Sequence, residues 1–250
     1  MTNKMTHTKI LALIPARMGS SRFPGKPMEK ILGKPMIGHV YENVIKSSLL
    51  HMTAVATCDK IIFDYIESIG GVAVMTANKH ERATDRCAEA MLKLEKLYNI
   101  EYDIVVMIQG DEPMTHPDMI GEAVSPMLND KNIQVVNLLG EVKDDAEFKD
   151  KNTIKVVCDL NMNAMYFSRE PIPTNANCNI GKQICVIPFK RNFLLDYTNL
   201  TPTPLEEAES IDMLRALEHG FKVYMTPTNH STHAVDTKED LKLVEKLMKE

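Results

Sequence analysis

The chain has 250 residues, a formal net charge of −5, 44% hydrophobic residues and 25% charged residues. This length fits one large α/β domain, or one domain with a small subdomain, and the composition is that of a globular protein with enough apolar side chains for a core. The acidic balance argues against broad binding to nucleic acid or to an anionic membrane, so a negatively charged substrate would need a local cluster of cations.

Apolar runs alternate with amphipathic segments through the first half of the chain. We expect strands at Ile10–Pro15, Ala54–Thr57, Val72–Thr76 and Ile104–Ile108, and helices at Met36–Ser48, Lys60–Ile69 and Thr84–Tyr98. Continuous apolar strands separated by helices indicate a parallel sheet that is covered on both faces. Ligands bind beyond the carboxyl ends of the strands in such sheets, so the loops after Ile14 and Ile108 are predicted to carry the chemistry.

The pattern changes after about Asn132. Strand-like segments follow at short intervals, at Val135–Val142, Ile154–Cys158, Ala164–Phe167 and Gln183–Phe189. The remaining elements are a helix at Pro202–His219, a late strand at Lys222–Met225 and an amphipathic helix at Lys238–Met248. We interpret this half as a mixed or antiparallel portion that continues the sheet and adds a lobe. No internal repeat or low-complexity linker interrupts the chain, which predicts one continuous domain over residues 1–250.

The cysteines and the N-terminal segment indicate the compartment. The five cysteines are Cys58, Cys87, Cys158, Cys178 and Cys185, and no two have the spacing of a zinc knuckle or a redox pair. Their number is odd and no secretion signal precedes them, so we expect free thiols in a reducing cytoplasm. The apolar run Ile10–Ile14 is too short for a signal or membrane-spanning helix. We therefore expect a cytoplasmic protein without a membrane partner.

The loop after the first strand, at residues 15–27, combines glycines with three cations. Glycines let backbone N–H groups approach an anion closely, and Arg17, Arg22 and Lys26 can neutralise a triphosphate. The spacing is neither that of a Walker P-loop nor that of a dinucleotide fingerprint. A solvated basic surface loop is the plainer alternative, but the position at the carboxyl end of a buried strand favours a phosphate site.

A second polar loop, Gln109–Pro113, directly follows the strand Ile104–Ile108. A carboxylate at Asp111 can hold Mg²⁺ against phosphate oxygens, because this ion prefers one or two carboxylates together with waters and substrate phosphates. An aspartate in a turn is usually only a turn former. Its expected position on the same sheet edge as the basic loop makes Asp111 a metal candidate.

Further motifs follow these two loops in the order of a known family. They are Gly33-Lys34-Pro35-Met36-Ile37, Lys155-Val156-Val157, Tyr166-Phe167-Ser168-Arg169 with Ile172-Pro173, Pro204-Leu205-Glu206 and Val235-Asp236-Thr237. On these motifs, nearly the whole chain resembles the CMP-Kdo synthetases (3-deoxy-manno-octulosonate cytidylyltransferases). The resemblance implies an α/β, Rossmann-like nucleotidyltransferase fold with a mixed, mostly parallel sheet and a small antiparallel lobe. It also implies a homodimer, with a nucleotide-binding part at about 9–130 and an acceptor-binding and dimerisation part at about 131–235.

The same resemblance implies an activity and a set of site residues. The reaction is transfer of a cytidylyl group from CTP to a small acidic sugar, Kdo or an analogue, with release of pyrophosphate, in lipopolysaccharide biosynthesis. The implied catalytic residues are Arg17, Lys26, Asp111 and Asp236, with the two aspartates as Mg²⁺ ligands. The implied nucleotide contacts are Ala16, Arg17, Gly19, Ser20, Arg22, Lys26, Arg86 and Gln109, and the implied acceptor contacts are Arg169, Gln183 and Glu209. We expect no covalent nucleophile, since this transfer depends on positioning and charge stabilisation.

Three segments depart from the family pattern. Arg82 and Ala83 stand where the family has a serine and a glycine near the nucleotide. On the acceptor side, Gln183 replaces a histidine, Ile187 replaces an aromatic residue with a hydroxyl, and Thr174–Asn177 replaces an aromatic and charged segment. A polar pocket selects substrates through hydrogen bonds to their hydroxyls, so these changes predict a modified acceptor such as an amino or deoxy analogue.

Two other functions stay open. One is a related nucleotidyltransferase that acts on a non-Kdo acid or a phosphonate. The other is an inactive nucleotide-binding regulatory protein, against which the retained cations and carboxylates argue. His230 and His233 have a spacing that could bind a metal, although two ligands do not define a site and a surface loop is the plainer interpretation.

Overall fold

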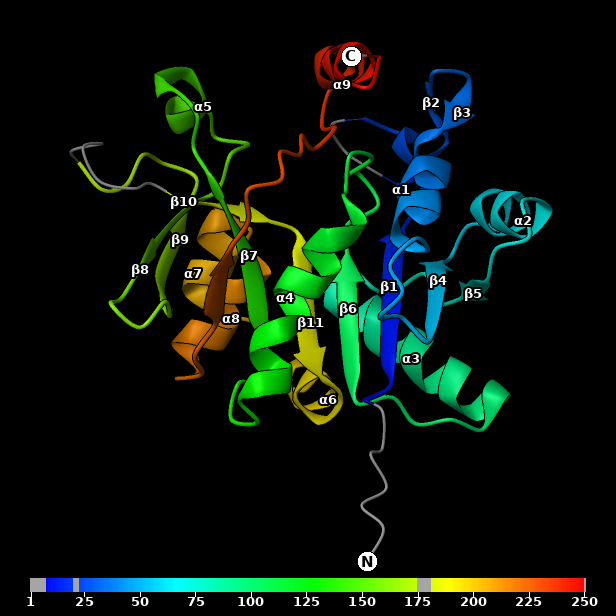
Figure 1. Ribbon diagram of the computed structural model, residues 1–250, viewed down its shortest axis with the longest axis horizontal. Coiled ribbons are helices and arrows are strands. Elements are labelled where there is room, and N and C mark those ends of the chain that lie inside the picture. The colour runs from blue at the N-terminus through cyan, green and yellow to red at the C-terminus, as the bar shows by residue number, and fades with distance from the viewer. Residues whose placement is uncertain (1–7, 20–22, 175–180, 250) are drawn as a thin grey trace, which may run out of the picture.

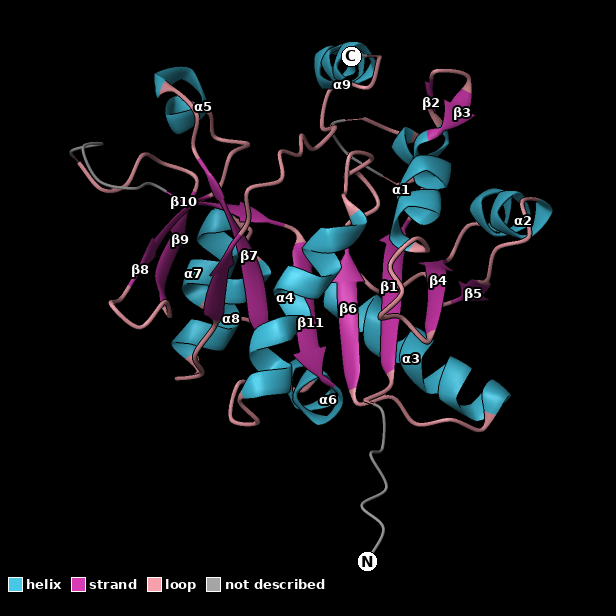
Figure 2. Cartoon of the chain, viewed as in Figure 1, coloured by secondary structure: helices cyan, strands magenta, loops and turns pink. Residues whose placement is uncertain are grey.

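The computed structural model describes residues 8–19, 23–174 and 181–249 of the chain (Figure 1). Two five-stranded sheets form its framework, with the orders β11-β6-β1-β4-β5 and β12-β7-β10-β8-β9. Helices flank the strands of both sheets (Figure 2). The central sheet is mixed and mostly parallel, and the second sheet is mostly antiparallel, as the sequence predicts.

The strands have the following bounds. The central sheet contains β1 (Ile10–Ala16), β4 (Met52–Thr57), β5 (Ala73–Met75), β6 (Ile104–Ile108) and β11 (Val186–Lys190). The second sheet contains β7 (Val136–Glu141), β8 (Lys155–Cys158), β9 (Ala164–Ser168), β10 (Gly181–Ile184) and β12 (Tyr224–Pro227). The short strands β2 (Lys30–Ile31) and β3 (Lys34–Pro35) form a hairpin beside the basic loop.

The helices connect these strands and cover them. They are α1 (Met36–Val44), α2 (Lys60–Ser68), α3 (Ala83–Tyr98), α4 (Pro117–Asn129), α5 (Asp145–Lys149), α6 (Arg191–Thr198), α7 (Pro204–Glu209), α8 (Asp212–Glu218) and α9 (Lys238–Leu247), with a 3₁₀ turn, η1, at Lys26–Met28. Within the described ranges, none of them is both long and apolar enough to cross a membrane.

The central sheet is apolar on both faces. Along β1, Leu11 and Leu13 pack into one core cluster with α3, α6 and α8, whereas Ile10, Ala12 and Ile14 pack into another with α1, α2 and α4. Successive strand residues point to opposite faces, so a strand covered on both sides must be apolar throughout. This explains the uninterrupted apolar run in the sequence.

The predicted single strand Gln183–Phe189 is wrong, because the chain changes sheets within it. β10 pairs with β7 and β8, and β11 pairs with β6 in the central sheet. Cys185 lies between the two strands, and its carbonyl accepts a hydrogen bond from the N–H of Gln109 at 3.1 Å. Both halves are extended and follow each other after a single residue, so strand periodicity alone does not reveal the crossing.

The predicted single helix Pro202–His219 is also wrong, because it divides into α7 and α8. Ser210 ends α7 in the left-handed conformation, with φ of 55°, and the N–H of Ile211 bonds to the carbonyl of Glu206 at 3.2 Å. Such a residue satisfies the last carbonyls of a helix and turns the chain. Helical spacing continues across the break, which is why the pattern does not show it.

The sequence patterns predict no helix at Pro117–Asn129, where the structure forms α4. Pro117 occupies the first turn, where a missing N–H costs nothing, and the His116 side chain accepts from the N–H of Asp118. The apolar residues Met119, Ile120, Ala123 and Val124 then bury one face against the central sheet. Pro126 obscures this helix in the sequence, because proline inside a helix is uncommon.

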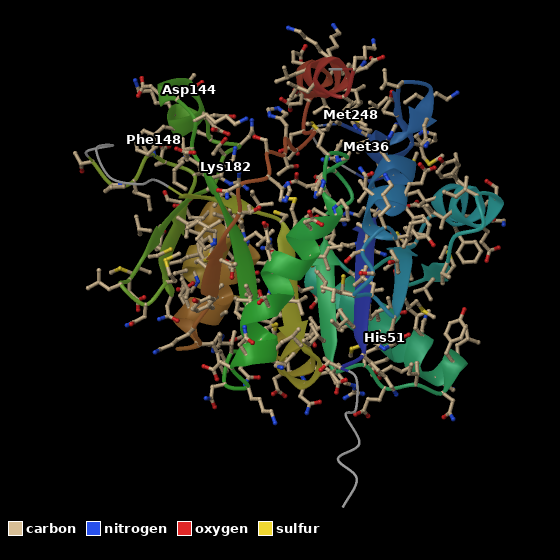
Figure 3. All side chains as sticks on the ribbon, viewed as in Figure 1. Met36, His51, Asp144, Phe148, Lys182 and Met248 are labelled. Carbon is tan, nitrogen blue, oxygen red and sulfur yellow. The ribbon has the colours of Figure 1, made fainter. Side chains whose placement is uncertain are left out.

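The C-terminal helix returns to the N-terminal third of the chain. α9 lies beside the β2-β3 hairpin in Figure 1, and a small cluster buries Val244 with Phe23, Ile31, Met36 and Val235. Met36 and Met248 are labelled near this junction in Figure 3, and Met248 packs against the same cluster. This packing brings the segment that carries Asp236 to the edge of the central sheet where β1 and β6 end.

Candidate functional site

A cavity of about 470 Å³ lies at this carboxyl edge, between the central sheet and the second sheet. Its walls come from the loops after β1 and β6, the segment before α3, the strands β10 and β11, and the segment before α9. The predicted site residues among its lining are Ala16, Arg17, Arg86, Gln109, Asp111, Arg169, Gln183 and Asp236. The cavity therefore lies beyond the carboxyl ends of β1 and β6, at the position where open α/β sheets bind ligands.

Lys26 joins the two predicted metal ligands. Its ammonium nitrogen lies 2.7 Å from Asp111 Oδ2 and 3.2 Å from Asp236 Oδ1, and all three side chains are largely buried. Burial lowers the pKa of Lys26, but the two carboxylates outweigh it and the net direction is upward. Two aspartates from distant parts of the chain thus converge on one cation.

Asp236 is held in place by its neighbours on both sides. Val235 is buried in the cluster under α9, and its N–H donates to the carbonyl of Asp111 at 2.9 Å. On the other side, Asp240 Oδ2 accepts from the N–H groups of Asp236 at 3.0 Å and Thr237 at 2.8 Å. Asp240 therefore positions Asp236, a role that the sequence analysis does not assign. The spacing Thr237-x-x-Asp240 is a capping-box pattern that could have revealed it.

The basic loop is tied to the end of β4. The N–H of Met18 donates to Asp59 Oδ2 at 2.8 Å, and the carbonyl of Met18 accepts from the N–H of Gly25 at 3.0 Å. Gly25 has φ of 79°, a conformation that favours glycine, and it closes the loop just before Lys26. Gly19 is exposed and does not line the cavity. Ser20 and Arg22 lie outside the described residues.

Arg17 and Arg86 meet at one backbone group. Both donate to the carbonyl of His80, Arg17 at 3.4 Å and Arg86 at 3.3 Å, and Arg86 also bonds to Thr76 Oγ1 at 2.5 Å. The His80 ring contacts the carboxylate of Glu89, which also accepts from the N–H of Ala77 at 3.0 Å. His80 therefore anchors this loop to α3.

The approach of the two loops requires a glycine. A Cβ added at Gly110 would lie 3.0 Å from the carbonyl oxygen of Pro15 and 3.3 Å from Ile37 Cδ1. Gly110 therefore allows the backbone after β6 to pack against the end of β1. Gln109 and Ala16 consequently lie side by side on the cavity wall, together with Asp111.

Glu112 lies next to Asp111 but is buried, with an exposed fraction of 5%. Burial raises the pKa of its carboxyl to about 7, against the effect of a hydrogen bond from the Thr232 hydroxyl. This bond is a second link between the loop after β6 and the segment around Val235, in addition to the bond from the N–H of Val235 to the carbonyl of Asp111. The sequence assigns no role to either residue.

Gln183 and Ile187, which the family resemblance assigns to the acceptor side, both line the cavity. The amide nitrogen of Gln183 donates to Asn137 Oδ1 at 2.6 Å, and Ile187 is buried. Lys182, which was missed in the sequence, adds a cation to this wall and pairs with Glu147 of α5. No motif in the sequence marks Lys182. Of the segment Thr174–Asn177, only Thr174 lies within the described residues.

Arg169 and Glu209 each bond to the backbone of the other residue. The Glu209 carboxylate accepts from the N–H of Arg169 at 2.8 Å and from the hydroxyls of Tyr166 and Ser168, each at 3.3 Å. The Arg169 guanidinium donates to the carbonyls of Glu209 at 2.7 Å and Lys151 at 2.9 Å. Arg169 lines the cavity and Glu209 does not.

Arg82, which departs from the family pattern, belongs to a charge cluster on the cavity wall. It lies 3.2 Å from Asp212 and 3.3 Å from Glu206, which in turn makes two bonds to Arg215 at 2.6 and 2.7 Å. Burial raises the pKa of Asp212, and Arg82 opposes that effect. The cluster ties the start of α3 to α7 and α8.

Comparison with known proteins gives concordant matches. Residues 11–235 match the family model described as Cytidylyltransferase. The chain is 40% identical to 3-deoxy-manno-octulosonate cytidylyltransferases from Geobacter metallireducens, over 96% of this chain and 98% of that protein, and from Trichlorobacter lovleyi, over 97% and 99%. A solved structure of CMP:2-keto-3-deoxy-manno-octonic acid synthetase complexed with CTP superimposes with a TM-score of 0.86 at 36% identity, covering 97% of this chain and 99% of that one.

Proposed function

Because the chain belongs to the 3-deoxy-manno-octulosonate cytidylyltransferase family, we propose that it transfers a cytidylyl group from CTP to Kdo or a closely related sugar acid and releases pyrophosphate. The acceptor hydroxyl attacks the α-phosphorus of CTP, and the bond from that phosphorus to the bridging oxygen breaks. One phosphodiester bond forms for each phosphoanhydride bond that is lost.

The convergence of Lys26, Asp111 and Asp236 carries this proposal. A cation and two carboxylates meet at the edge of the central sheet where β1 and β6 end, and both carboxylates line a cavity whose walls also carry arginines and Lys182. Transfer of this kind requires positioning and neutralisation of phosphate charge rather than a covalent intermediate. The superposition on a relative that is complexed with CTP supports CTP as the donor.

The donor set also fits Mg²⁺, which we propose as the cofactor. Asp111 and Asp236 already place their oxygens 2.7 and 3.2 Å from one cation, the Lys26 ammonium. Hard carboxylate oxygens in small number, completed by water and phosphate, are the ligands that Mg²⁺ prefers. Bound there, the ion would neutralise charge on the triphosphate.

The side chains of this protein have distinct tasks in the proposed reaction. Lys26 can turn from the carboxylates to a phosphate oxygen, and its raised pKa keeps it charged. Arg17 adds a positive charge at the other end of the basic loop, where its guanidinium donates to the carbonyl of His80. Arg86 is buried and holds the carbonyl of His80 and the hydroxyl of Thr76, so it shapes the nucleotide side rather than supplying a mobile cation.

The acceptor is an acid, since Lys182 and Arg169 are both on the acceptor wall. Gln183 presents an amide that is neutral at every pH, and Ile187 presents no hydroxyl. These two residues favour a relative of Kdo with a different functional group over Kdo itself. The alternative of a non-Kdo acid or a phosphonate rests on the same two positions, and the inactive alternative is disfavoured by the intact Lys26-Asp111-Asp236 set.

Pyrophosphate release from CTP with a panel of acceptors tests the function. We expect release that depends on Mg²⁺ and on a 2-keto-3-deoxy sugar acid. Release only with other acids or with phosphonates would support a nucleotidyltransferase that acts on a non-Kdo acceptor. Binding of CTP without release for any acceptor would support the inactive alternative.

The assembly and the compartment are also proposals. The homodimer, built through the part at about 131–235, rests on the family resemblance, and sedimentation equilibrium of the full chain tests it. The cytoplasm is the proposed compartment, where CTP is available and where the thiols of Cys58, Cys87, Cys158 and Cys185 would stay reduced.

A further inference from the structure

Two histidines and an aspartate form a cluster apart from the carboxylates of the candidate site. His116 and His230 stack their rings with centroids 4.1 Å apart, and Asp118 joins them. A nitrogen of each histidine and a carboxylate oxygen of Asp118 all lie within 4.8 Å of one another. His230 therefore contacts His116, which lies far from it in the sequence. It does not pair with His233, which instead contacts Asp240 on the cavity wall.

The distances within the cluster are close to those of a coordinated ion. Asp118 Oδ2 lies 3.5 Å from His116 Nδ1 and 4.0 Å from His230 Nε2. Ligand atoms that are about 2.0–2.1 Å from a tetrahedral zinc ion lie roughly 3.3 Å from one another. Both distances exceed this spacing by less than an ångström, and the ligand atoms of the two histidines lie within 4.8 Å of each other, so a contraction of the cluster would bring the three side chains around one ion.

Glu122 adds a second carboxylate to the cluster, and within the part of the chain that the structure describes one of its oxygens has no hydrogen-bond partner. Its Oε1 lies 3.7 Å from His230 Nε2, while its Oε2 is buried and has no hydrogen-bond partner among the described residues. A buried carboxylate oxygen without a partner is costly. A cation bound beside it would remove that cost. Glu122 follows Asp118 by four residues on α4, so both side chains project from the same helix face.

We propose that His116, Asp118, Glu122 and His230 form a binding site for a divalent transition-metal ion such as Zn²⁺. Imidazole and carboxylate are suitable ligands for this ion, whereas Mg²⁺ prefers oxygen ligands alone. The parallel rings must tilt apart so that their lone pairs converge, which their partial exposure permits. Nδ1 of His116 gives up only a 3.3 Å bond from the N–H of Asp118.

The location gives this site a structural consequence. His116 begins α4, directly after the loop that carries Asp111, and His230 precedes the segment that carries Asp236. The ion would join the same two segments that the Asp111–Val235 and Glu112–Thr232 hydrogen bonds join. Its binding should therefore stabilise the folded protein.

Calorimetric titration of the metal-free full chain with Zn²⁺, in excess Mg²⁺, tests the proposal. The Mg²⁺ occupies sites made of oxygen ligands alone and leaves an imidazole site open. We expect one strongly bound Zn²⁺ per chain and a higher Tm. Loss of an outer partner of a metal ligand costs roughly 10- to 100-fold in affinity, so loss of a ligand itself should cost no less.

Two variants remove ligands with little other damage. His116→Asn keeps a side chain that can cap α4, and His230→Ala removes the second imidazole. Both should weaken Zn²⁺ binding and abolish the rise in Tm, while His219→Ala and His233→Ala should leave both unchanged. The proposal would be overturned if the unaltered chain had no strong site, or if His116→Asn and His230→Ala bound Zn²⁺ as tightly as the unaltered chain does.

Discussion

The backbone N–H of Val235 donates to the backbone carbonyl of Asp111 at 2.9 Å, and so binds together the two segments that supply the predicted metal ligands. A backbone bond of this kind sets the separation of the neighbouring side chains without depending on their identity. The carboxylates of Asp111 and Asp236 consequently converge on Lys26 before any substrate is present. Preorganised charge of this type lowers the barrier to phosphoryl-type transfer.

Asp111→Asn and Asp236→Asn should each reduce turnover by roughly 10²–10³-fold, the cost of removing one preorganised electrostatic contact. Each change removes a charge that would hold Mg²⁺ against the triphosphate. Pyrophosphate release across a Mg²⁺ titration measures the effect, and circular dichroism checks the fold. Asp64→Asn, on the exposed surface of α2, is the matched control. Near-normal rates at limiting Mg²⁺ would mean that the altered aspartate is not a ligand.

The chain should bind CTP in the presence of Mg²⁺ in preference to UTP, ATP and GTP. The basis is family membership, together with a cavity of about 470 Å³ at the carboxyl edge of the sheet. Calorimetric titration with the four nucleotides measures the preference. Arg17→Met should weaken binding of all four to a similar degree, because the triphosphate is common to them. Equal or tighter binding of UTP or a purine nucleotide would contradict the assignment of the base.

The kcat/KM for Kdo should be roughly 10²-fold lower than that for the true acceptor. Two lost hydrogen bonds cost about 1–3 kcal/mol each, and other contacts to the acceptor compensate for part of this loss. Gln183 and Ile187 both line the cavity, and the Gln183 amide is already bonded to Asn137. Specificity constants for Kdo, its 8-amino analogue and other keto acids give the comparison. Gln183→His should shift the preference towards Kdo. A wide preference of the unaltered chain for Kdo would refute the argument from these two positions.

Arg82→Met should lower the free energy of unfolding by roughly 1–2 kcal/mol, since it removes the cation that pairs with the partly buried Asp212 carboxylate. The expected loss of stability is small because the Arg82 side chain is 27% exposed and water screens its charge. Arg82→Ser should be less destabilising, because Arg82 occupies the N-cap of α3 without capping it and a serine can cap there. Urea unfolding compares the variants. In the Arg82→Met background, Asp212→Asn should restore stability, and a further loss would show that no charge was left unpaired.

Glu89→Gln should lower stability at neutral pH, with a difference that shrinks in acid. Burial works to raise the pKa of Glu89, but hydrogen bonds from Lys93, Ala77 and His80 lower it from 4.5 to about 2. The charged carboxylate therefore stabilises the fold fully above pH 4.5, and this contribution is lost as the pH falls through about 2. Urea unfolding from pH 7 downwards tests this, with Glu67→Gln on the exposed face of α2 as the control. A difference that grows below pH 4.5 would have the wrong sign.

Local sequence patterns were enough to predict the central sheet and the edge that carries the site. The strands β1, β4, β5 and β6 and the helices α1, α2 and α3 follow from apolar runs and helical spacing, because residues that are close in sequence set these periods. The parallel order then places the loops after β1 and β6 together, so Lys26 and Asp111 could be assigned to one site. Family motifs added Asp236, which no local pattern would bring there.

The contacts between residues that are far apart in the sequence could not be predicted from local patterns. The change of sheets at Cys185, the break of the helix at Ser210, the Asp240 clamp on Asp236 and the Arg82–Asp212 pair all depend on packing between separate segments. The spacing of His230 and His233 suggested one pair, and the fold formed another, His230 with His116. Periodicity reports which face of an element is buried, whereas the partner across that face depends on how the elements pack together.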